Sequence, residues 1–288
     1  MEILIIGLLL GATYSLIAMG LTLQYGVARI MNLANGEMLV VGAFGAFWIF
    51  TARNQSPYVA LLLVVPGAFL LNWLIYRYLL RPLVRRAKNR GMLEVDSILA
   101  TFGLSFAFVG IMRRVSGGEF FAYSYLSEPF NIFGSPYELN RTVACLFSVG
   151  VCGLLYLGLN RTRTGMALRA VAVDPEAAGL VAIDVPKMSA FAFALGGAVT
   201  AAGGIVMSTF LTMDASIGIV FTMKALIIVI MGGVGDVRGA IIAGLILGFA
   251  ETAVASLIDP GLTLAAAYLL FVLTLLFRPQ GLFGRRPS

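Results

Sequence analysis

Carboxylate and carboxamide side chains interrupt otherwise apolar stretches of this chain at two places. The first holds Asn32, Asn35 and Glu37 within the sequence Asn-Leu-Ala-Asn-Gly-Glu, and Gln24 precedes it by about two helical turns. The second is Glu251, near the middle of an apolar run. Because such groups are costly in lipid, we expect all five side chains to face the protein interior or a water-filled path.

The chemistry expected of residues 32–37 is the binding or passage of a polar ligand. Gly36 is expected to break or kink the helix and to free backbone groups for that ligand, which membrane proteins tolerate only away from lipid. The alternative is a polar cluster that only holds helices together. Glu251 either lines the pathway or pairs with another helix, and the sequence assigns it no basic partner. Lys224 lies nearer the outer end of its apolar run, where we expect its side chain to snorkel.

The residue types needed for several other chemistries are missing. The chain contains no histidine, which excludes histidine metal sites and histidine general bases, and it shows no recognisable nucleophile–base arrangement. We therefore predict no catalytic residues and no metal site. The glycine-rich segment from residue 232 to residue 239 lacks the Gly-Lys-Ser/Thr of a phosphate loop. It is predicted to be a tight turn between spans, and we expect this chain to bind no ATP or other cofactor.

The elements that position these residues are predicted to be membrane-spanning helices. Hydrophobic residues make up 60% of the 288 residues and charged residues 12%, and the mean hydropathy is +0.95. These values are typical of a polytopic membrane protein. Since about 20 helical residues cross a bilayer, the uncharged runs predict an all-α bundle of eight or nine spans. The whole chain, residues 1–288, is expected to form one transmembrane domain.

Three polar segments connect the expected spans: a basic loop at 81–95, an outer loop at 113–140 and a segment at 161–187. Lysine and arginine in short loops mark the cytoplasmic side of a membrane. The basic clusters are Arg81, Arg85, Arg86, Lys88 and Arg90, then Arg161, Arg163, Arg169 and Lys187, and finally Arg278, Arg285 and Arg286. We therefore expect 81–95, 161–187 and the C-terminus in the cytoplasm, with the N-terminus outside if there are nine spans. The net charge of +6 reflects this distribution and does not indicate nucleic-acid binding.

The segment 161–187 carries the signals of a short helix exposed to water. Asp174 is predicted to be its N-cap, Pro175 its first helical residue and Glu176 an acid in its first turn. The helix can continue from Ala177 as far as residue 182, and the proline at 186 prevents it from running much further. A capped helix between two spans indicates a surface that contacts another molecule.

Taken together, several motifs resemble the permease subunits of branched-chain amino-acid ABC importers. The resemblance runs essentially from end to end, and the order of the motifs makes it specific. The motifs lie at residues 20–26, 32–37, 165–170, 174–187, 232–236 and 276–283. One departure is Asn35, where many relatives have histidine, so a role that requires a titrating group does not transfer to this position. The permeases of urea importers share most of these motifs.

The resemblance implies a set of partners and a location. It implies a homologous second permease subunit, two cytoplasmic ATPase subunits that bind ATP and magnesium, and a periplasmic or surface-anchored substrate-binding protein. It also implies a multi-pass protein of the bacterial inner membrane, with Gln24, Asn32, Asn35, Glu37 and Glu251 as candidates for the translocation path. The residues it assigns to ATPase coupling are Gly165, Arg169, Asp174, Pro175, Glu176, Ala177, Ala178 and Gly179.

Two other functions are alternatives to the import of branched-chain amino acids. One is an ABC permease for urea or short-chain amides. The other is an ion-coupled secondary transporter, which would use Glu37 and Glu251 as its coupling sites. The capped cytoplasmic helix argues against the second of these, because a secondary transporter has no ATPase to engage.

Overall fold

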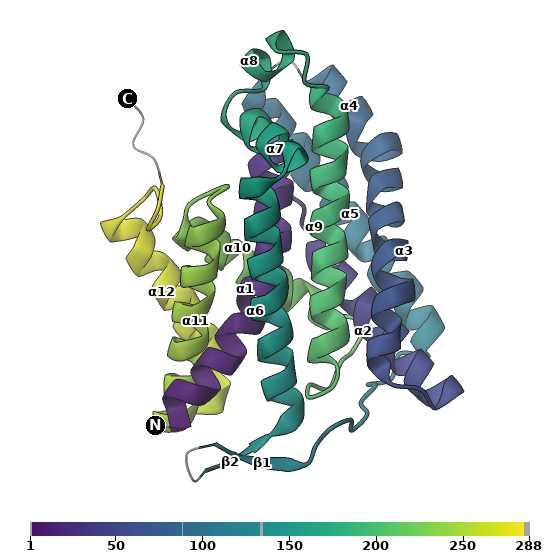
Figure 1. Ribbon diagram of the computed structural model, residues 1–288, viewed down its shortest axis with the longest axis vertical. Coiled ribbons are helices and arrows are strands. Elements are labelled where there is room, and N and C mark those ends of the chain that lie inside the picture. Colours follow the sequence, from purple (N-terminus) through teal and green to yellow (C-terminus); the bar gives the residue numbers. More distant parts are fainter. Residues whose placement is uncertain (1, 88, 133–134, 285–288) are drawn as a thin grey trace.

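The apolar runs of the sequence fold into long helices that lie side by side in a bundle (Figure 1). The computed structural model describes residues 2–87, 89–132 and 135–284. Lys88, Arg285 and Arg286, which the orientation argument used, lie outside the described residues. The long helices are α1 (Glu2–Ala28), α2 (Asn35–Arg53), α3 (Ala60–Ile75), α5 (Arg90–Ser116), α6 (Leu139–Arg161), α9 (Val185–Met207), α10 (Ile217–Gly232), α11 (Val237–Leu257) and α12 (Thr263–Phe277).

Shorter elements connect these helices at the two ends of the bundle. They are η1 (Pro57–Val59), η2 (Tyr76–Leu80), α4 (Arg81–Arg86), β1 (Pro129–Ile132), β2 (Ser135–Glu138), α7 (Arg163–Val173), α8 (Pro175–Leu180) and η3 (Pro260–Leu262). Figure 1 shows α4, α7 and α8 at one end, called the α8 end here, and the N-terminus and the hairpin at the other. The hairpin is antiparallel, with Pro129 opposite Glu138 and Ile132 opposite Ser135.

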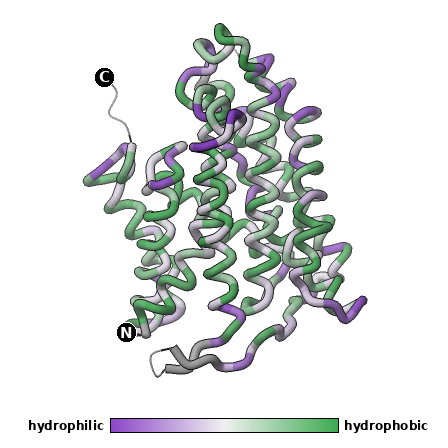
Figure 2. Tube along the Cα trace, in the orientation of Figure 1, coloured by the Kyte–Doolittle hydropathy of each residue, from purple (hydrophilic) through white to green (hydrophobic). Residues whose placement is uncertain are grey.

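The predicted all-α membrane bundle is confirmed. Among the described residues, 8 helical stretches are long and apolar enough to cross a bilayer. Helix α10 has only 16 residues, which is about 24 Å of helix, against a hydrocarbon layer of about 30 Å. The expected range of eight or nine spans therefore depends on whether α10 is counted as a full crossing. Figure 2 shows hydrophobic residues along the helices and hydrophilic ones mainly toward the ends.

The helices differ sharply in how much of their surface other helices cover. In α9, 89% of the most apolar stretch is buried, whereas in the stretch that includes α12 the share is 6%. Helices α1 and α9 form the centre, while α3, α5, α6 and α12 expose large apolar side chains such as Leu62, Leu154 and Leu269. A bundle with apolar residues on its outside and small residues at its centre is adapted to lipid, not to water.

Helices α1 and α11 cross at a contact made by small residues. Gly7 and Gly11 of α1 face Gly244 and Gly248 of α11. A Cβ atom on Gly11 would lie 2.8 Å from the Cα atom of Leu245, and one on Gly248 would lie 2.7 Å from the carbonyl oxygen of Gly7. Because the neighbouring atoms are backbone, only glycine allows the two helices to approach this closely.

Gly11→Ala is therefore expected to destabilise the protein by about 1–3 kcal/mol through overpacking. The matched control is Gly67→Ala on α3, where a Cβ atom would meet nothing within 4 Å. Thermal unfolding of the two purified variants in the same detergent measures the difference. Equal midpoints for Gly11→Ala and Gly67→Ala would contradict the packing argument.

The predicted basic loop at 81–95 is mostly helical, so the prediction of a loop was wrong there. It contains α4 and the first turns of α5, and the side chain of Asn89 caps α5 by accepting a hydrogen bond from the backbone N–H of Met92 at 2.8 Å. Asparagine is a favoured N-cap residue. Arg81, Arg85 and Arg86 belong to α4, and Arg90 is the first residue of α5. The sequence analysis did not identify Asn89 as an N-cap, because the segment was interpreted from its many basic residues.

The predicted outer loop at 113–140 is shorter than expected, because α5 continues to Ser116 and α6 begins at Leu139. Its first part folds against α2. Phe121 pairs through its backbone with Met213, and its ring lies 5.7 Å from that of Phe44. Tyr123 stacks on Phe50 at 4.9 Å and hydrogen-bonds to Ser208. Burial raises the pKa of the Tyr123 phenol to about 12, so this tyrosine stays protonated while it holds the loop to the bundle.

Candidate functional site

The segment 161–187 forms two helices, of which the sequence predicted only the second. Helix α7 begins where the side chain of Thr162 accepts a hydrogen bond from the backbone N–H of Gly165 at 3.0 Å. Gly165 also fits closely against the end of α6, since a Cβ atom there would lie 2.5 Å from the Cα atom of Leu159. This glycine therefore allows α7 to fold back on α6. Arg169 lies further along α7, on the wall of a cavity described below.

The predicted N-cap of the second helix is confirmed. The Oδ1 atom of Asp174 accepts hydrogen bonds from the backbone N–H groups of Glu176, at 2.9 Å, and Ala177, at 3.1 Å, and Pro175 is the first residue of α8. The helix ends at Leu180, two residues earlier than its expected limit, because Ala182 has a positive φ of 61°. A left-handed residue cannot continue a right-handed helix.

Helix α8 is fixed on one side and exposed on the other. Ala178 is 3% exposed and belongs to a hydrophobic cluster with Leu168 and Val171 of α7. By contrast, Leu180 is 89% exposed, and a Cβ atom on Gly179 would meet nothing within 4 Å. Leu180 is therefore an exposed apolar side chain on a helix that is held in place by packing against α7.

The end of this segment is fixed by a second cap. The Oδ1 atom of Asp184 accepts a hydrogen bond from the backbone N–H of Lys187, and its Oδ2 atom lies 2.8 Å from the Lys187 ammonium. The hydrogen bonds from Lys187 lower the pKa of the Asp184 carboxyl from its usual value. Asp184 therefore stays ionised at neutral pH and stabilises the start of α9.

The structure brings four of the five predicted path residues together near the start of α2. The chain breaks its helix between Ala28 and Asn35, just before Gly36 and not at it. Gln24 donates a hydrogen bond to the carbonyl oxygen of Phe193 in α9 and accepts one from Asn32 at 2.9 Å. Both side chains are at most 2% exposed. The Oδ1 atom of Asn32 also accepts a hydrogen bond from the backbone N–H of Ala34 at 3.0 Å, so this side chain satisfies a backbone donor within the break.

Asn35 and Glu37 are fully buried and only partly hydrogen-bonded. The Oδ1 atom of Asn35 accepts a hydrogen bond from Thr200 at 3.1 Å, and the Oε1 atom of Glu37 accepts one from Ser105 at 2.8 Å. The Nδ2 atom of Asn35 and the Oε2 atom of Glu37 have no partner among the described residues. Unsatisfied buried polar atoms cost free energy and call for an explanation such as a functional role.

The start of α2 meets the start of α10 at this same place. The backbone N–H of Gly36 donates to the hydroxyl of Thr222 at 2.8 Å. A Cβ atom on Gly218 would lie 2.7 Å from the Oε2 atom of Glu37. Two helices thus begin beside one buried carboxylate, and their glycines allow the backbones to touch.

Glu251, the fifth predicted path residue, lies in a separate buried group. Its Oε2 atom accepts hydrogen bonds from the ammonium of Lys224 at 2.8 Å and from the phenol of Tyr14 at 2.7 Å, and Lys224 also donates to Tyr14 at 2.7 Å. Glu251 and Lys224 are 2% and 9% exposed. The triad joins α1, α10 and α11, while Glu251 retains a second oxygen with no partner among the described residues.

The expectation that Lys224 snorkels was therefore wrong. Lys224 is 9% exposed, and its ammonium is held within the bundle by Glu251. The sequence contains one positive and one negative residue in two neighbouring apolar runs, but it does not show that they pair. The polar groups also have uncharged hydrogen-bond partners, and nothing in the sequence marks these as partners. They are Tyr14, Ser105, Thr200 and Thr222.

The glycine-rich segment forms the predicted tight turn between α10 and α11. Gly233 and Gly235 have positive φ angles of 104° and 80°, which L side chains adopt only with strain. The Oδ1 atom of Asp236 then caps α11 by accepting from the backbone N–H groups of Arg238 and Gly239. Among the described residues, no group of three or more histidine, cysteine, aspartate or glutamate side chains is placed to hold a metal ion.

Comparison with known sequences identifies relatives over nearly the whole chain. Residues 3–277 match the family described as the permease component of branched-chain amino acid transport systems. The chain is 29% identical to the high-affinity branched-chain amino acid transport system permease protein LivH of Salmonella typhimurium, over 97% of this chain and 94% of that protein. It is 29% identical to BraD of Pseudomonas aeruginosa, a permease protein described in the same words, over 98% and 95%.

A more partial similarity extends to a transporter of another substrate. The chain is 29% identical to the L-arabinose transport system permease protein AraH of Escherichia coli, over 56% of this chain and 51% of that protein. No solved structure matches.

Proposed function

Since the chain belongs to the permease family of branched-chain amino acid transport systems, we propose that it is the membrane-spanning subunit of an ATP-driven importer of branched-chain amino acids. The family and the apolar helices make it a multi-pass membrane protein. The observation that carries the proposal is α8, a capped helix that is anchored through Ala178 and exposes Leu180 and Gly179 at one end of the bundle.

In the proposed complex this chain pairs with a homologous permease subunit and with two cytoplasmic ATPase subunits. The ATPases bind ATP and magnesium, and this chain binds neither. A periplasmic or surface-anchored protein delivers the substrate. The α8 end faces the cytoplasm, in agreement with the basic residues in short segments there. Closure of the ATPases on ATP displaces α7 and α8 and changes which side of the membrane the path is open to.

The coupling surface is proposed to be α8 with the residues that support it. Asp174, Pro175, Glu176 and Ala177 form its first turn, Ala178 anchors it, and Gly179 leaves its outer face open to an ATPase. Gly165 and Arg169 belong to α7, which transmits the displacement to α6 through the close contact at Gly165. Because Ala178 ties α8 to α7, a push on one helix moves both.

The translocation path is proposed to run beside the buried polar groups at the start of α2 and α10. Gln24, Asn32, Asn35 and Glu37 meet there, and the unpartnered atoms of Asn35 and Glu37, which are buried in this structure, become available to a polar ligand when the path opens. An amino acid carries an ammonium and a carboxylate, which require such groups when they leave water. Glu251 contributes from the neighbouring triad through its unpartnered oxygen.

Glu37→Gln is expected to reduce substrate uptake by about tenfold while the protein remains folded. Glutamine keeps the shape of the side chain and an acceptor for Ser105, but removes the ionisable carboxyl group and replaces one of its oxygens with an amide nitrogen. Initial uptake rates and thermal unfolding of the same preparation measure the two effects separately. Ser105→Ala is the matched control, since it removes the hydrogen bond to Oε1 and keeps the carboxyl group. Uptake by Glu37→Gln at the rate of the unmodified protein would show that Glu37 does not contribute to the translocation path.

Reconstitution of the complete complex in proteoliposomes tests the function itself. With the binding protein outside and ATP supplied to the ATPases, we expect uptake of radiolabelled leucine, and no uptake without ATP. Urea in place of leucine tests the nearest alternative substrate. Preferential uptake of urea would show that urea is the substrate, and the protein would still be a subunit of an ATP-driven importer. Uptake driven by a sodium or proton gradient, without ATPase subunits, would contradict an ATP-driven importer.

A further inference from the structure

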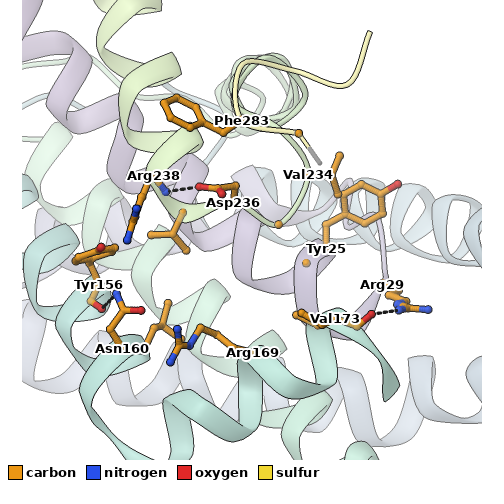
Figure 3. Close-up of a pocket in the computed structure, with 16 residues that line it drawn as sticks. Tyr25, Arg29, Tyr156, Asn160, Arg169, Val173, Val234, Asp236, Arg238 and Phe283 are labelled. Carbon is orange, nitrogen blue, oxygen red and sulfur yellow. Dashed lines mark hydrogen bonds between the residues drawn. The ribbon is translucent and has the colours of Figure 1, made fainter. Parts of the chain in front are cut away.

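A cavity of about 860 Å³ opens at the α8 end, between the ends of α1 and α6, helix α7 and the turn before α11 (Figure 3). Three arginines from three different elements line it: Arg29 after α1, Arg169 on α7 and Arg238 on α11. None of the ion pairs formed among the described residues involves these arginines. The cavity therefore concentrates positive charge that the described part of the chain does not neutralise.

Among the described residues that line the cavity, the one carboxylate is that of Asp236, and it is already hydrogen-bonded. Asp236 uses its Oδ1 atom to cap α11, accepting from the backbone N–H groups of Arg238 and Gly239 at 2.8 and 3.0 Å. The described residues that line the cavity include three arginines and one aspartate, an excess of two positive charges. Guanidinium groups are suited to the oxygens of a phosphate group.

Two of the arginines are held in position by neighbours on the wall. The guanidinium of Arg238 lies over the ring of Tyr156, 5.4 Å from its centroid. The Nη2 atom of Arg29 lies 3.5 Å from the carbonyl oxygen of Val173. Figure 3 shows Arg238 and Tyr156 on one side of the cavity and Arg29 on the other, with Arg169 on the wall formed by α7. Tyr25 and Tyr156 both line the cavity, and tyrosine is enriched at the level of lipid headgroups.

An apolar surface continues from the cavity toward the middle of the bundle. On α6, Val149 is 58% exposed and lies about three helical turns before the lining residue Asn160, on the same face of the helix. On α11, Ile242 is 40% exposed and follows Arg238 by one turn. A ligand with a phosphate in the cavity and hydrocarbon chains along α6 and α11 would match both surfaces.

We propose that this cavity binds the phosphate headgroup of an anionic phospholipid, whose acyl chains lie against the exposed apolar residues of α6 and α11. This site goes beyond the transport function and does not depend on it. Basic pockets between transmembrane helices on the cytoplasmic side are suited to anionic headgroups. Because Arg169 and Arg29 border α7, a bound lipid joins α1, α7 and α11 at the α8 end.

Native mass spectrometry of the complete, delipidated complex tests the proposal with phosphatidylglycerol as the probe. We expect the complex to retain phosphatidylglycerol in preference to phosphatidylcholine, and Arg238→Gln to weaken retention by about tenfold, the loss expected for one charge-assisted contact. The control is Arg85→Gln, which removes an exposed arginine of α4 at the same end of the bundle and is expected to change nothing.

Three results would overturn the lipid site. Equal retention of the two lipids, or unchanged retention in Arg238→Gln, would show that the arginines do not select the headgroup. Displacement of the lipid by inorganic phosphate alone would identify a free anion as the ligand. Retention by the permease subunits that disappears when the ATPases assemble would show that a protein segment fills the cavity.

Discussion

Lys224→Met is expected to lower the free energy of unfolding by about 3–5 kcal/mol, because it leaves a buried carboxylate without its countercharge. Glu251 is 2% exposed, and the ammonium of Lys224 and the phenol of Tyr14 both donate to its Oε2 atom. Removing one partner of a buried ion pair costs far more than the pair contributes in net stability. The loss should appear as a lower unfolding midpoint and a lower yield of folded protein in detergent.

The chain supplies a matched control for this prediction. Lys187 and Asp184 form a second ion pair with the same 2.8 Å separation, but at the surface. Lys187→Met is expected to produce no measurable loss, since water screens an exposed pair. Replacing the whole triad, as Lys224→Met with Glu251→Met and Tyr14→Phe, should cost less than Lys224→Met alone, because no buried polar group is then left unpartnered. A triple variant that is less stable than the single variant would contradict the account.

Asp174→Arg and Gly179→Trp are expected to abolish ATP-driven uptake while the assembled complex continues to hydrolyse ATP. The first removes both hydrogen bonds that cap α8 and places a positive charge at the helix N-terminus, where it is unfavourable. The second adds bulk where the structure has open space, so it obstructs a docking partner and leaves the fold of this chain intact. Uptake and phosphate release in the same proteoliposomes measure the separation of transport from hydrolysis.

Gly91→Trp is the matched control for bulk at the same end of the bundle. A Cβ atom on Gly91 comes no closer than 3.9 Å to another group, the side chain of Asn89. We expect Gly91→Trp to transport normally, because it lies at the start of α5 and not on α8. Normal uptake by Gly179→Trp and Asp174→Arg would show that α8 is not the coupling helix. Equal losses of uptake in all three variants would show the same.

Features encoded by neighbouring residues were predictable from the sequence. The Asp174 cap, the start of α8 at Pro175 and the turn around Gly233 depend on side chains and backbone angles within a few positions of each other. The apolar runs predicted the bundle for the same reason, since each span is a local property of about 20 residues. Helix α7 was missed because its cap, Thr162, stands in a segment dense with arginine.

Features that depend on which helices become neighbours were not predictable in the same way. Lys224 and Glu251 are 27 positions apart, and Tyr14 joins them from the other end of the chain. Glu37 was singled out because a carboxylate in an apolar run is unusual, but its partner Ser105 resembles any serine in a helix. Only the packing of α2 against α5 and α10 reveals which oxygen of Glu37 is left without a partner.

Photo-crosslinking from α8 shows whether this helix contacts an ATPase subunit. The residue to replace with benzoylphenylalanine is Leu180, because its side chain is 89% exposed. The control position is Phe120, 76% exposed in the outer loop at the opposite end. On irradiation of the assembled complex, we expect a covalent product between position 180 and an ATPase subunit, and none from position 120. A complex that assembles and transports, yet forms no ATPase product from position 180, would contradict the assignment of α8 as the coupling helix.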